Sequence, residues 1–504
     1  MKRFFALFLL ILSTFGLQAQ SFPYPELALQ QSFVEGHMRF LASDALQGRR
    51  TGEPGNNMAA HYLASYFEAY GLKKAPGMDS YLQSFNLENR VKPASGHLKI
   101  AGKDYKQGSN LLLLSGAPAN AASAKVVFAN HGMIDPEKGI DDYAGLDVKG
   151  KVVLVLAGTQ ENSDFQTVFR MARRQSKQRI AAEKGALALI EIYTLSYPWD
   201  IFSNLFGGSR PTLKSDGGEE AGSSLVYGWL NEPDKAMINK LSNMNDKKVS
   251  FASSGAAVED VPTQNVIGWI EGTDPELKDE FVVLTAHYDH VGTGKSNDPQ
   301  SQDTIFNGAR DNGLGTVSVL AAAKSLVEAP TKRSVLLIAL TGEEIGLLGA
   351  RYYTENPVVP LEKTIFNLNS DNAGYNDTEL ISIIGFGRTG TDQQVKTGVE
   401  AVGLKVFPDP APEQGLFDRS DNVQFASKGV PCITFSGGFK DFDAELSKYY
   451  HQVTDDADSL DFGYVLKYCQ SYAHVARWIA NMEGRPVWAA GDKYEAAGKE
   501  LYKN

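Results

Sequence analysis

The segment "TAHYDHVG" (285–292) contains two histidines and an aspartate and directly follows the apolar run "FVVL" (281–284). The chain has only 8 histidines in 504 residues, so two of them within four positions need an explanation. Imidazole and carboxylate groups can hold a metal ion or move protons, although a histidine at a strand end is more often an ordinary polar residue. His287 and Asp289 are therefore the first candidates for a metal site.

Other side chains of these types follow other apolar runs. Glu343 and Glu344 follow "SVLLIAL" (334–340), and Asp371 follows "TIFNLNS" (364–370). Each feature alone has an ordinary structural explanation, because paired glutamates are common at helix starts and Asp-Asn-Gly sequences are common in turns. Their joint occurrence favours a site, which is completed by three further candidates: Asp311 in "NGARDNGLG" and Tyr450 and His451 in "KYYHQVTDD".

Two imidazoles and three carboxylates suit borderline divalent metals, above all zinc. Three carboxylates beside two divalent ions leave a net charge of about +1, which a bridging hydroxide would neutralise. Such a hydroxide is available near neutral pH and is a nucleophile. The Glu343–Glu344 pair also supplies one carboxylate beyond the ligand count, as a proton carrier.

The elements that must position these residues are continuous apolar strands. The runs 281–286, 334–340, 364–370 and 430–436 are near-continuous apolar runs, and 315–329 has a helical pattern. Strands of this kind are buried on both faces, which predicts an α/β domain with a doubly wound, mostly parallel sheet. Ligands of such sheets bind beyond the carboxyl ends of the strands, where the candidate residues lie.

The rest of the chain predicts export and a second domain. Residues 1–19 have a charged start, the short apolar stretch "FFALFLLIL" and small residues before a cut, as in a secretory signal peptide. We therefore expect an exported protein, periplasmic or extracellular, without a membrane span. Residues 20–106 would begin the catalytic domain, 107–260 would form a β-rich insert with no cluster of ligand-type residues, and 261–504 would complete the catalytic domain.

The composition argues against nucleic acid as a partner and does not decide whether the two cysteines form a disulfide. The formal net charge of −11 argues against nucleic-acid binding, which requires a basic face. Cys432 and Cys469 are equally compatible with a disulfide, which export permits, and with two buried thiols. The oligomeric state is not predicted.

The segments "AHYDHVG", "GARDNGLGT", "TGEEIGLLGA", "LNSDNAG" and "YYHQVTDD" resemble, in this order, the motifs of the co-catalytic di-zinc aminopeptidases. These are the bacterial leucyl-type aminopeptidases, which are related to glutamate carboxypeptidase. The insert, with "DDYAGLDVKGKVVLVLAG", is similar to the protease-associated domain of many members. The resemblance covers nearly the whole mature chain and implies a zinc exopeptidase-like fold.

The resemblance also implies a role for each residue. Two zinc ions per chain would be held by His287 and Asp371 on one side and by Glu344 and His451 on the other, with Asp311 bridging them. Glu343 would be the general base, and Asp289 would orient the His287 imidazole. Tyr450 would donate to the oxyanion, and His290 has no assigned role beyond local hydrogen bonding.

The expected activity is removal of N-terminal amino acids from peptide substrates. A carboxypeptidase or dipeptidase of the same family is the main alternative, and a glutaminyl cyclase or a non-catalytic receptor is less favoured because all ligand positions are filled. Arg310 departs from the family pattern, and we expect its positive charge beside the metals to influence substrate preference. The preferred N-terminal residue and the role of the insert stay open.

Overall fold

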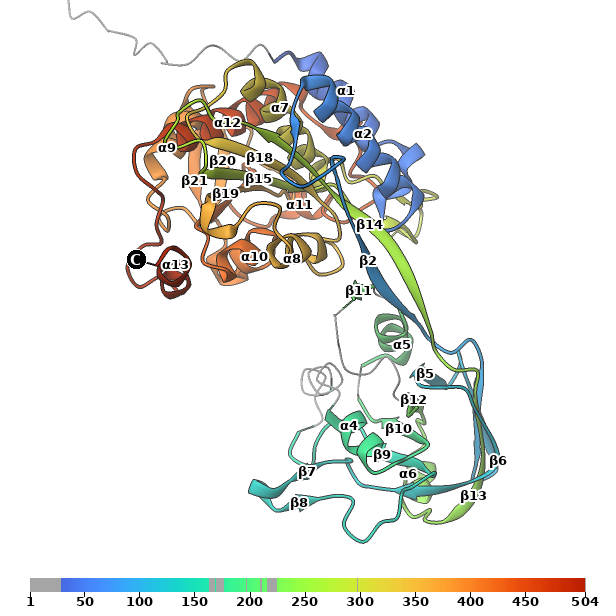
Figure 1. Cartoon of the computed structure of the whole chain (residues 1–504). Helices are drawn as coiled ribbons and strands as arrows, with labels where there is room; N and C mark the ends of the chain where they lie inside the picture. Colours follow the sequence, from blue (N-terminus) through green and yellow to red (C-terminus); the bar gives the residue numbers. More distant parts are fainter. Residues whose placement is uncertain are drawn as a thin grey trace, which may run out of the picture. The chain divides into compact units, whose positions relative to one another are not determined.

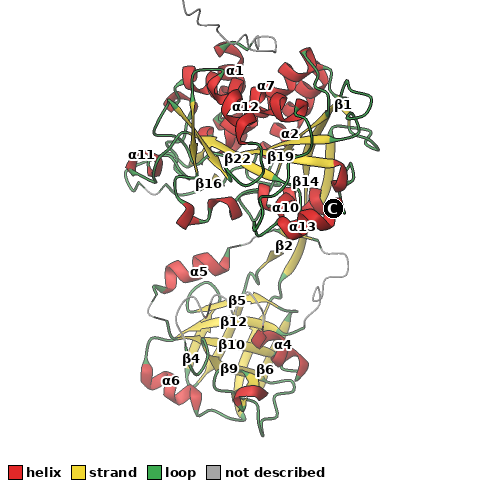
Figure 2. Ribbon diagram, turned by 90° about the vertical axis from the view of Figure 1, so that its left-hand side faces the viewer, coloured by secondary structure: helices red, strands yellow, loops and turns green. Residues whose placement is uncertain are grey.

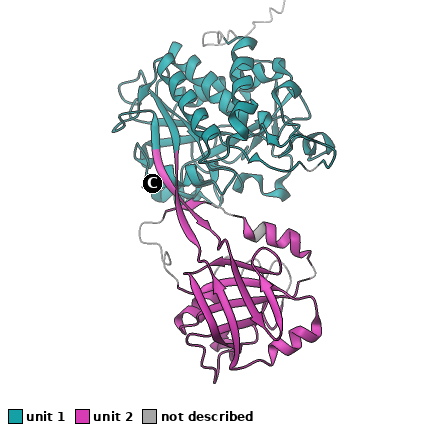
Figure 3. Ribbon diagram, turned by 90° about the vertical axis from the view of Figure 1, so that its right-hand side faces the viewer, with its two compact units in different colours: residues 1–83, 264–504 teal, residues 84–263 magenta. Residues whose placement is uncertain are grey.

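The computed structural model describes residues 29–162, 168, 176–195, 197–208, 211–214, 224–296 and 298–503. The expected signal peptide, 1–19, lies outside the described residues. The chain divides into two compact units, drawn in teal and magenta in Figure 3. Unit 1 comprises Met1–Gln83 and Gln264–Asn504, and unit 2 comprises Ser84–Thr263.

The centre of the unit 1 sheet consists of the four strands that the apolar runs predict. They are ordered β18 (Ser334–Leu340), β15 (Phe281–His287), β19 (Thr364–Ser370) and β22 (Cys432–Gly437). Each pairs in parallel with the next. Every residue of the four strands is buried, which explains why their sequences do not alternate.

Antiparallel strands flank this parallel centre and make the sheet mixed. β14 (Ala257–Ile270) pairs antiparallel with β18, and β20 (Leu380–Ile384) pairs antiparallel with β22. Beyond them, β21 (Lys405–Pro408) pairs in parallel with β20, and β1 (Lys73–Lys74) pairs antiparallel with β14. The predicted α/β fold class is confirmed, with the parallel arrangement confined to the inner strands and the β20–β21 pair.

Helices cover both faces of the unit 1 sheet (Figures 1 and 2). Val282 and Leu284 of β15 share one core cluster with helices α1, α2, α7, α9 and α12, whereas Val283 faces a second cluster with α8, α10 and α13. The sheet is thus doubly wound. The helices are α1 (Gln31–Leu41), α2 (Pro54–Tyr70), α7 (Gly315–Glu328), α8 (Leu348–Glu355), α9 (Asp392–Glu400), α10 (Asn422–Ser427), α11 (Ala444–Ser447), α12 (Phe462–Asn481) and α13 (Glu495–Tyr502).

Unit 2 is built on an eight-stranded sheet. Its order is β4 (Lys103–Lys106), β3 (Gly96–Ile100), β13 (Lys247–Ser253), β6 (Ala119–Phe128), β9 (Val152–Leu156), β10 (Ala188–Tyr193), β12 (Val226–Asn231) and β5 (Leu111–Ser115). Its described helices are α4 (Ser176–Glu183), α5 (Trp199–Gly207) and α6 (Lys235–Ser242). Short strands of unit 2 are β7 (Ile134–Asp135), β8 (Ile140–Asp141) and β11 (Thr212–Leu213), and those of unit 1 are β16 (Gly292–Thr293) and β17 (Ile305–Phe306).

The range expected for the insert, 107–260, begins later than unit 2 does. Strands β3 and β4 precede residue 107 but pair within the unit 2 sheet, so they belong to that unit. The chain enters unit 2 through β2 (Leu82–Val91) and leaves it through β14. The identity of unit 2 as a protease-associated domain stays a prediction.

The two cysteines are free thiols. Cys432 in β22 and Cys469 in α12 are both buried, and burial raises the pKa of each thiol. The sequence left open a disulfide or two buried thiols, and the structure has two buried thiols.

Within the described part of the chain, no helix combines the length and apolar character that a membrane crossing requires.

Candidate metal centre

The register of the parallel strands brings the candidate side chains to one edge of the sheet. His287 at the end of β15 pairs with Leu340 of β18, and Glu343 follows Leu340 by three residues. On the other side Thr285 pairs with Asn369 of β19, so His287 and Asp371 lie at the same level two residues later. The carboxyl ends of three neighbouring strands therefore carry these residues, as expected for this fold.

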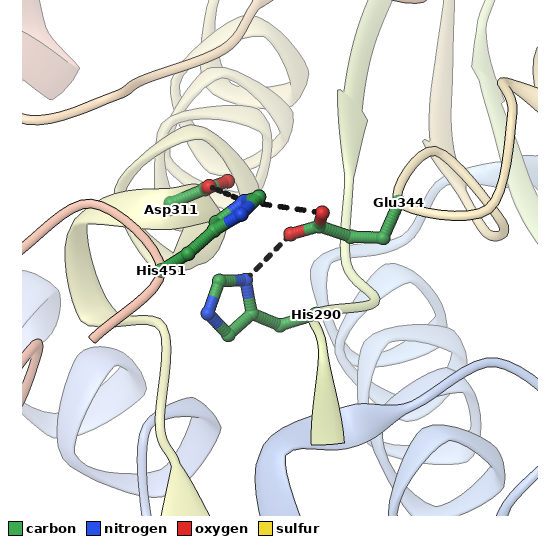
Figure 4. A group of neighbouring side chains, drawn as sticks. All are labelled: His290, Asp311, Glu344 and His451. Atoms are coloured by element: carbon green, nitrogen blue, oxygen red, sulfur yellow. Dashed lines mark ion pairs between the residues drawn. The ribbon is translucent and has the colours of Figure 1, made fainter. Parts of the chain in front are cut away.

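Two groups of potential metal donors form at this edge, and Asp311 belongs to both. One consists of His287, Asp311 and Asp371. The other consists of His290, Asp311, Glu344 and His451 and is drawn in Figure 4. Within each group the donor atoms lie within 4.8 Å of one another.

The distances in these groups fit shared zinc ions. His287 Nε2 lies 3.4 Å from Asp311 Oδ1 and 3.3 Å from Asp371 Oδ1. His451 Nε2 lies 3.1 Å from Asp311 Oδ2 and 3.2 Å from Glu344 Oε2. Two donors at ~2.0–2.1 Å from a tetrahedral zinc ion are about 3.3 Å apart. The five residues expected as ligands thus have the chemistry and the spacing for two zinc ions, with one Asp311 oxygen toward each.

The neighbouring glutamates differ in their electrostatic environment. Burial raises the pKa of Glu343, and although His287 opposes this shift, the nearby carboxylates of Asp371 and Asp421 add to it. Burial acts in the same direction on Glu344, but the imidazoles of His290 and His451 outweigh it and lower its pKa. Paired carboxyls with opposite shifts are suited to different tasks, proton transfer for Glu343 and ligation for Glu344.

Asp289 is completely buried and connects His287 with Glu343. The backbone carbonyl of Asp289 lies 3.2 Å from His287 Nδ1, and its carboxylate oxygen Oδ1 is 3.6 Å from the same nitrogen. The carboxylate accepts hydrogen bonds from the Glu343 backbone N–H at 3.2 Å and from the Thr51 hydroxyl at 2.8 Å. Asp289 is thus placed to fix both the imidazole and the turn that carries Glu343.

Tyr450 lies beside these groups, where its ring stacks on His451 with the centroids 4.2 Å apart. Both residues line a pocket with a volume of about 100 Å³, together with Asp311, Glu343 and Asp371. The rest of the pocket wall is largely apolar, with one arginine; it consists of Ala373, Ile384, Leu416, Arg419, Ser420, Thr434, Ser436, Phe439 and Phe442. The structure therefore brings all eight predicted site residues together, and their individual roles stay predictions.

His290 is a residue whose importance the sequence did not reveal. Its imidazole is fully buried, and Nδ1 lies 2.7 Å from Glu344 Oε1, the oxygen opposite the one near His451 (Figure 4). This separation is shorter than the roughly 3.3 Å expected for two ligands of one zinc ion and brings the two side chains into direct contact. His290 is therefore better placed to orient Glu344 than to bind metal, and the "HYDH" spacing was the available signal.

Arg310 does not reach the pocket wall, which argues against the expected influence on substrate preference. Its guanidinium is buried, donates to the Ser459 backbone carbonyl at 2.9 Å, and packs 3.6 Å from the centre of the Tyr449 ring. It is also 3.7 Å from Asp455 and is not part of the pocket wall. The arginine that reaches the pocket is Arg419, which the sequence analysis did not single out.

The chain is similar in sequence to known aminopeptidases. The aminopeptidase YwaD of Bacillus subtilis (strain 168) is 25% identical over 426 residues, which span 80% of this chain and 82% of the relative. Aminopeptidase Y of Saccharomyces cerevisiae (strain ATCC 204508 / S288c) is 28% identical over 365 residues, 67% of this chain and 62% of the relative.

Solved structures show the same fold. An aminopeptidase from Aneurinibacillus sp. strain AM-1 superimposes with a TM-score of 0.56 at 20% identity, covering 92% of this chain and 97% of that one.

Residues 265–475 match the sequence model of peptidase family M28. This matched range contains every residue of the two donor groups, together with Asp289, Glu343 and Tyr450, so the whole candidate site lies in the part of the chain that is similar to this peptidase family, and the chain is an enzyme.

Proposed function

We propose that the chain is an exported zinc-dependent aminopeptidase that removes N-terminal amino acids from peptides. The observation that carries this proposal is the position of Asp311, whose two oxygens face two separate donor groups beside the Glu343 carboxyl. The names of the relatives, aminopeptidase YwaD and aminopeptidase Y, support the same activity.

In this proposal two zinc ions bind per chain. His287 and Asp371 would hold one, Glu344 and His451 would hold the other, and Asp311 would contribute to both. When bound, zinc polarises a carbonyl group and lowers the pKa of water to near 7. The donors need support of their own, and the Ser420 hydroxyl donates a hydrogen bond to the outer oxygen of Asp371.

The proton steps belong to Glu343. Its carboxylate takes a proton from the attacking water and passes it to the amine that leaves when the peptide bond breaks. Burial raises the pKa of Glu343 above its ordinary value, which makes its carboxylate a stronger proton acceptor. Asp289 holds the Glu343 backbone, and the Tyr450 phenol, at the pocket wall, donates to the carbonyl oxygen on which negative charge develops.

The charge balance favours a substrate with a free amine. Once the zinc ions offset their ligands, Glu343 and Asp289 remain as surplus acid, which attracts an α-ammonium group and repels a carboxylate. The apolar part of the pocket wall, with Ile384, Leu416 and Phe439, offers room for the first side chain of the peptide. Residues 1–19 have the sequence pattern of a secretory signal peptide, which supports export to the periplasm or beyond the cell.

A dipeptidase or carboxypeptidase is the second candidate, and Arg419 favours it. A guanidinium at the pocket wall can pair with the C-terminal carboxylate of a short substrate. Arg310, in contrast, is too deeply packed for this task.

The two candidates differ in which terminus must be free. The purified protein is assayed on amino-acid p-nitroanilides, on their N-acetylated forms and on N-blocked peptides with a free C-terminus, with and without a chelator. We expect chelator-sensitive hydrolysis of the free p-nitroanilides and little of the acetylated ones. Efficient cleavage of the N-blocked peptides would replace the aminopeptidase proposal by the carboxypeptidase one.

A further inference from the structure

Arg49 reaches the back of the metal centre from a segment far away in the sequence. It lies outside the range that matches the family, and its side chain is only 1% exposed. The guanidinium donates to the backbone carbonyls of Tyr288 at 2.8 Å, Asn307 at 2.6 Å and Gly308 at 2.9 Å, and also to that of Leu41. Burial lowers the pKa of Arg49 to about 10, so it is still charged at neutral pH.

The peptide groups that follow Gly308 are held by a buried carboxylate. Asp455 is fully buried, and its carboxylate accepts hydrogen bonds from the backbone N–H groups of Arg310, at 2.9 and 3.1 Å, and Asp311, at 3.1 Å. Its own backbone carbonyl accepts from the Ala309 N–H at 3.0 Å. In the loop 307–311, the first two carbonyl groups thus accept hydrogen bonds from the Arg49 guanidinium. The backbone N–H groups that follow donate to the Asp455 carboxylate.

We propose that Arg49 and Asp455 are positioning residues that set the place of Asp311 between the two metals. Arg49 also holds the carbonyl of Tyr288, the residue between His287 and Asp289, and so ties the β15 end to the same loop. This proposal rests on the proposed zinc site. Hydrogen bonds from charged groups are stronger and more directional than neutral ones, which suits them to fixing a ligand loop.

The competing explanation is that Arg49 merely stabilises the fold, and Arg333 provides a matched control. Arg333 is also 1% exposed and lies in the same unit. Its guanidinium donates to the backbone carbonyls of Met482 at 2.6 Å and Gly484 at 2.7 Å and pairs with Glu280 at 2.7 Å. None of these partners adjoins a proposed zinc ligand, so losing Arg333 costs stability without disturbing the metal centre.

The test compares Arg49→Met with Arg333→Met. Zinc affinity is measured by competition with a chromophoric chelator, and the visible absorption of the cobalt-substituted protein reports the ligand geometry. We expect both variants to unfold at lower temperature. Only Arg49→Met should lose about 10–100-fold in zinc affinity, as is typical when a partner of a ligand is removed, and only it should change the cobalt spectrum.

Wild-type affinity and an unchanged cobalt spectrum in Arg49→Met would overturn the positioning role. If Arg49→Met does not fold, the same comparison uses Arg49→Lys and Arg333→Lys, which keep the charge but replace the rigid planar fork of five N–H donors by one ammonium group with three. Asp455→Asn, measured in the same way, must also weaken zinc binding, and unaltered binding contradicts the proposal. Failure of the wild-type protein to bind zinc would overturn the proposed function instead.

Discussion

His290 Nδ1 and Glu344 Oε1 are 2.7 Å apart, while the other oxygen of Glu344 faces His451 at 3.2 Å. One carboxylate therefore has one oxygen toward the proposed zinc ion and one toward a buried imidazole. Such a partner fixes the direction in which the ligand oxygen points.

We predict that His290→Phe weakens the binding of one of two zinc ions by about 10–100-fold and leaves the other unchanged. The reason is that Phe keeps the ring volume but cannot hold Oε1. Calorimetric titration of zinc into the metal-free protein measures both affinities. His37→Phe is the control, because the buried His37 imidazole is hydrogen-bonded to Tyr62 and Tyr70 and not to a candidate metal ligand. Equal effects of the two variants would refute an orienting role.

Glu343→Gln should keep both zinc ions and lose about 10²–10⁴-fold or more in turnover, because the amide cannot carry the proton. Glu344→Gln should instead lose or weaken one ion. Metal analysis and steady-state kinetics on the same preparations separate the two outcomes. Near-native turnover of Glu343→Gln would show that another group is the base.

Removing the shared carboxylate should affect both metals. We expect Asp311→Ala to reduce zinc content toward zero, whereas Asp371→Ala retains one ion per chain. Metal analysis of the dialysed proteins gives the stoichiometry, with the wild-type protein expected to hold two. A wild-type protein that is fully active with one ion would contradict the shared-ligand assignment.

Asp421 gives the metal-free protein a pH-dependent stability. Its carboxyl is fully buried, neither oxygen has a hydrogen-bond partner in the described part of the chain, and burial raises its pKa to about 8. Because this value is above that of an unfolded aspartate, about 3.9, folding favours the protonated form. The contribution to stability is complete below about pH 4 and disappears as the pH rises through 8.

Asp421→Asn, which cannot ionise, should therefore gain free energy of unfolding relative to the wild type as the pH rises from 5 to 8.5. We expect a relative gain on the order of a few kcal/mol in urea titrations of the chelated proteins. Asp441→Asn, at an exposed aspartate, controls for the general loss of a carboxylate. A stability difference between Asp421→Asn and wild type that is the same at both pH values would refute this account.

The strands and the donor set could be predicted because they depend on local sequence. The runs that became β15 and β18 are apolar at most positions, the run of β19 contains Ile365, Phe366 and Leu368, and His287 and the acids lie at or just after the strand ends. A parallel pairing then makes the strand ends neighbours without further information. The sequences of β14 and β20 do not indicate that these two strands run antiparallel to their neighbours.

What the sequence could not give depends on contacts between distant residues. Arg310 stands beside Asp311 in the chain, yet its guanidinium turns to Ser459 and Tyr449, which no local pattern shows. Arg49 reaches carbonyls about 240 and 260 positions away, at Tyr288 and Gly308. Carbonyl groups are present at every residue, so a side chain that binds them leaves no trace in composition or spacing.

The two strands that carry the chain into and out of unit 2 meet within unit 1. The Asn265 side-chain amide donates to Gln83 Oε1 at 3.0 Å, and the Ile267 N–H donates to the Tyr81 carbonyl at 2.7 Å. The residues that precede and follow Ser84–Thr263 are therefore hydrogen-bonded neighbours. A hairpin turn of roughly two to five residues is enough to connect two such neighbouring strands. Among the described residues, the candidate donors, Glu343 and the pocket wall all lie outside Ser84–Thr263, so a chain closed by such a turn would retain every side chain of the candidate site.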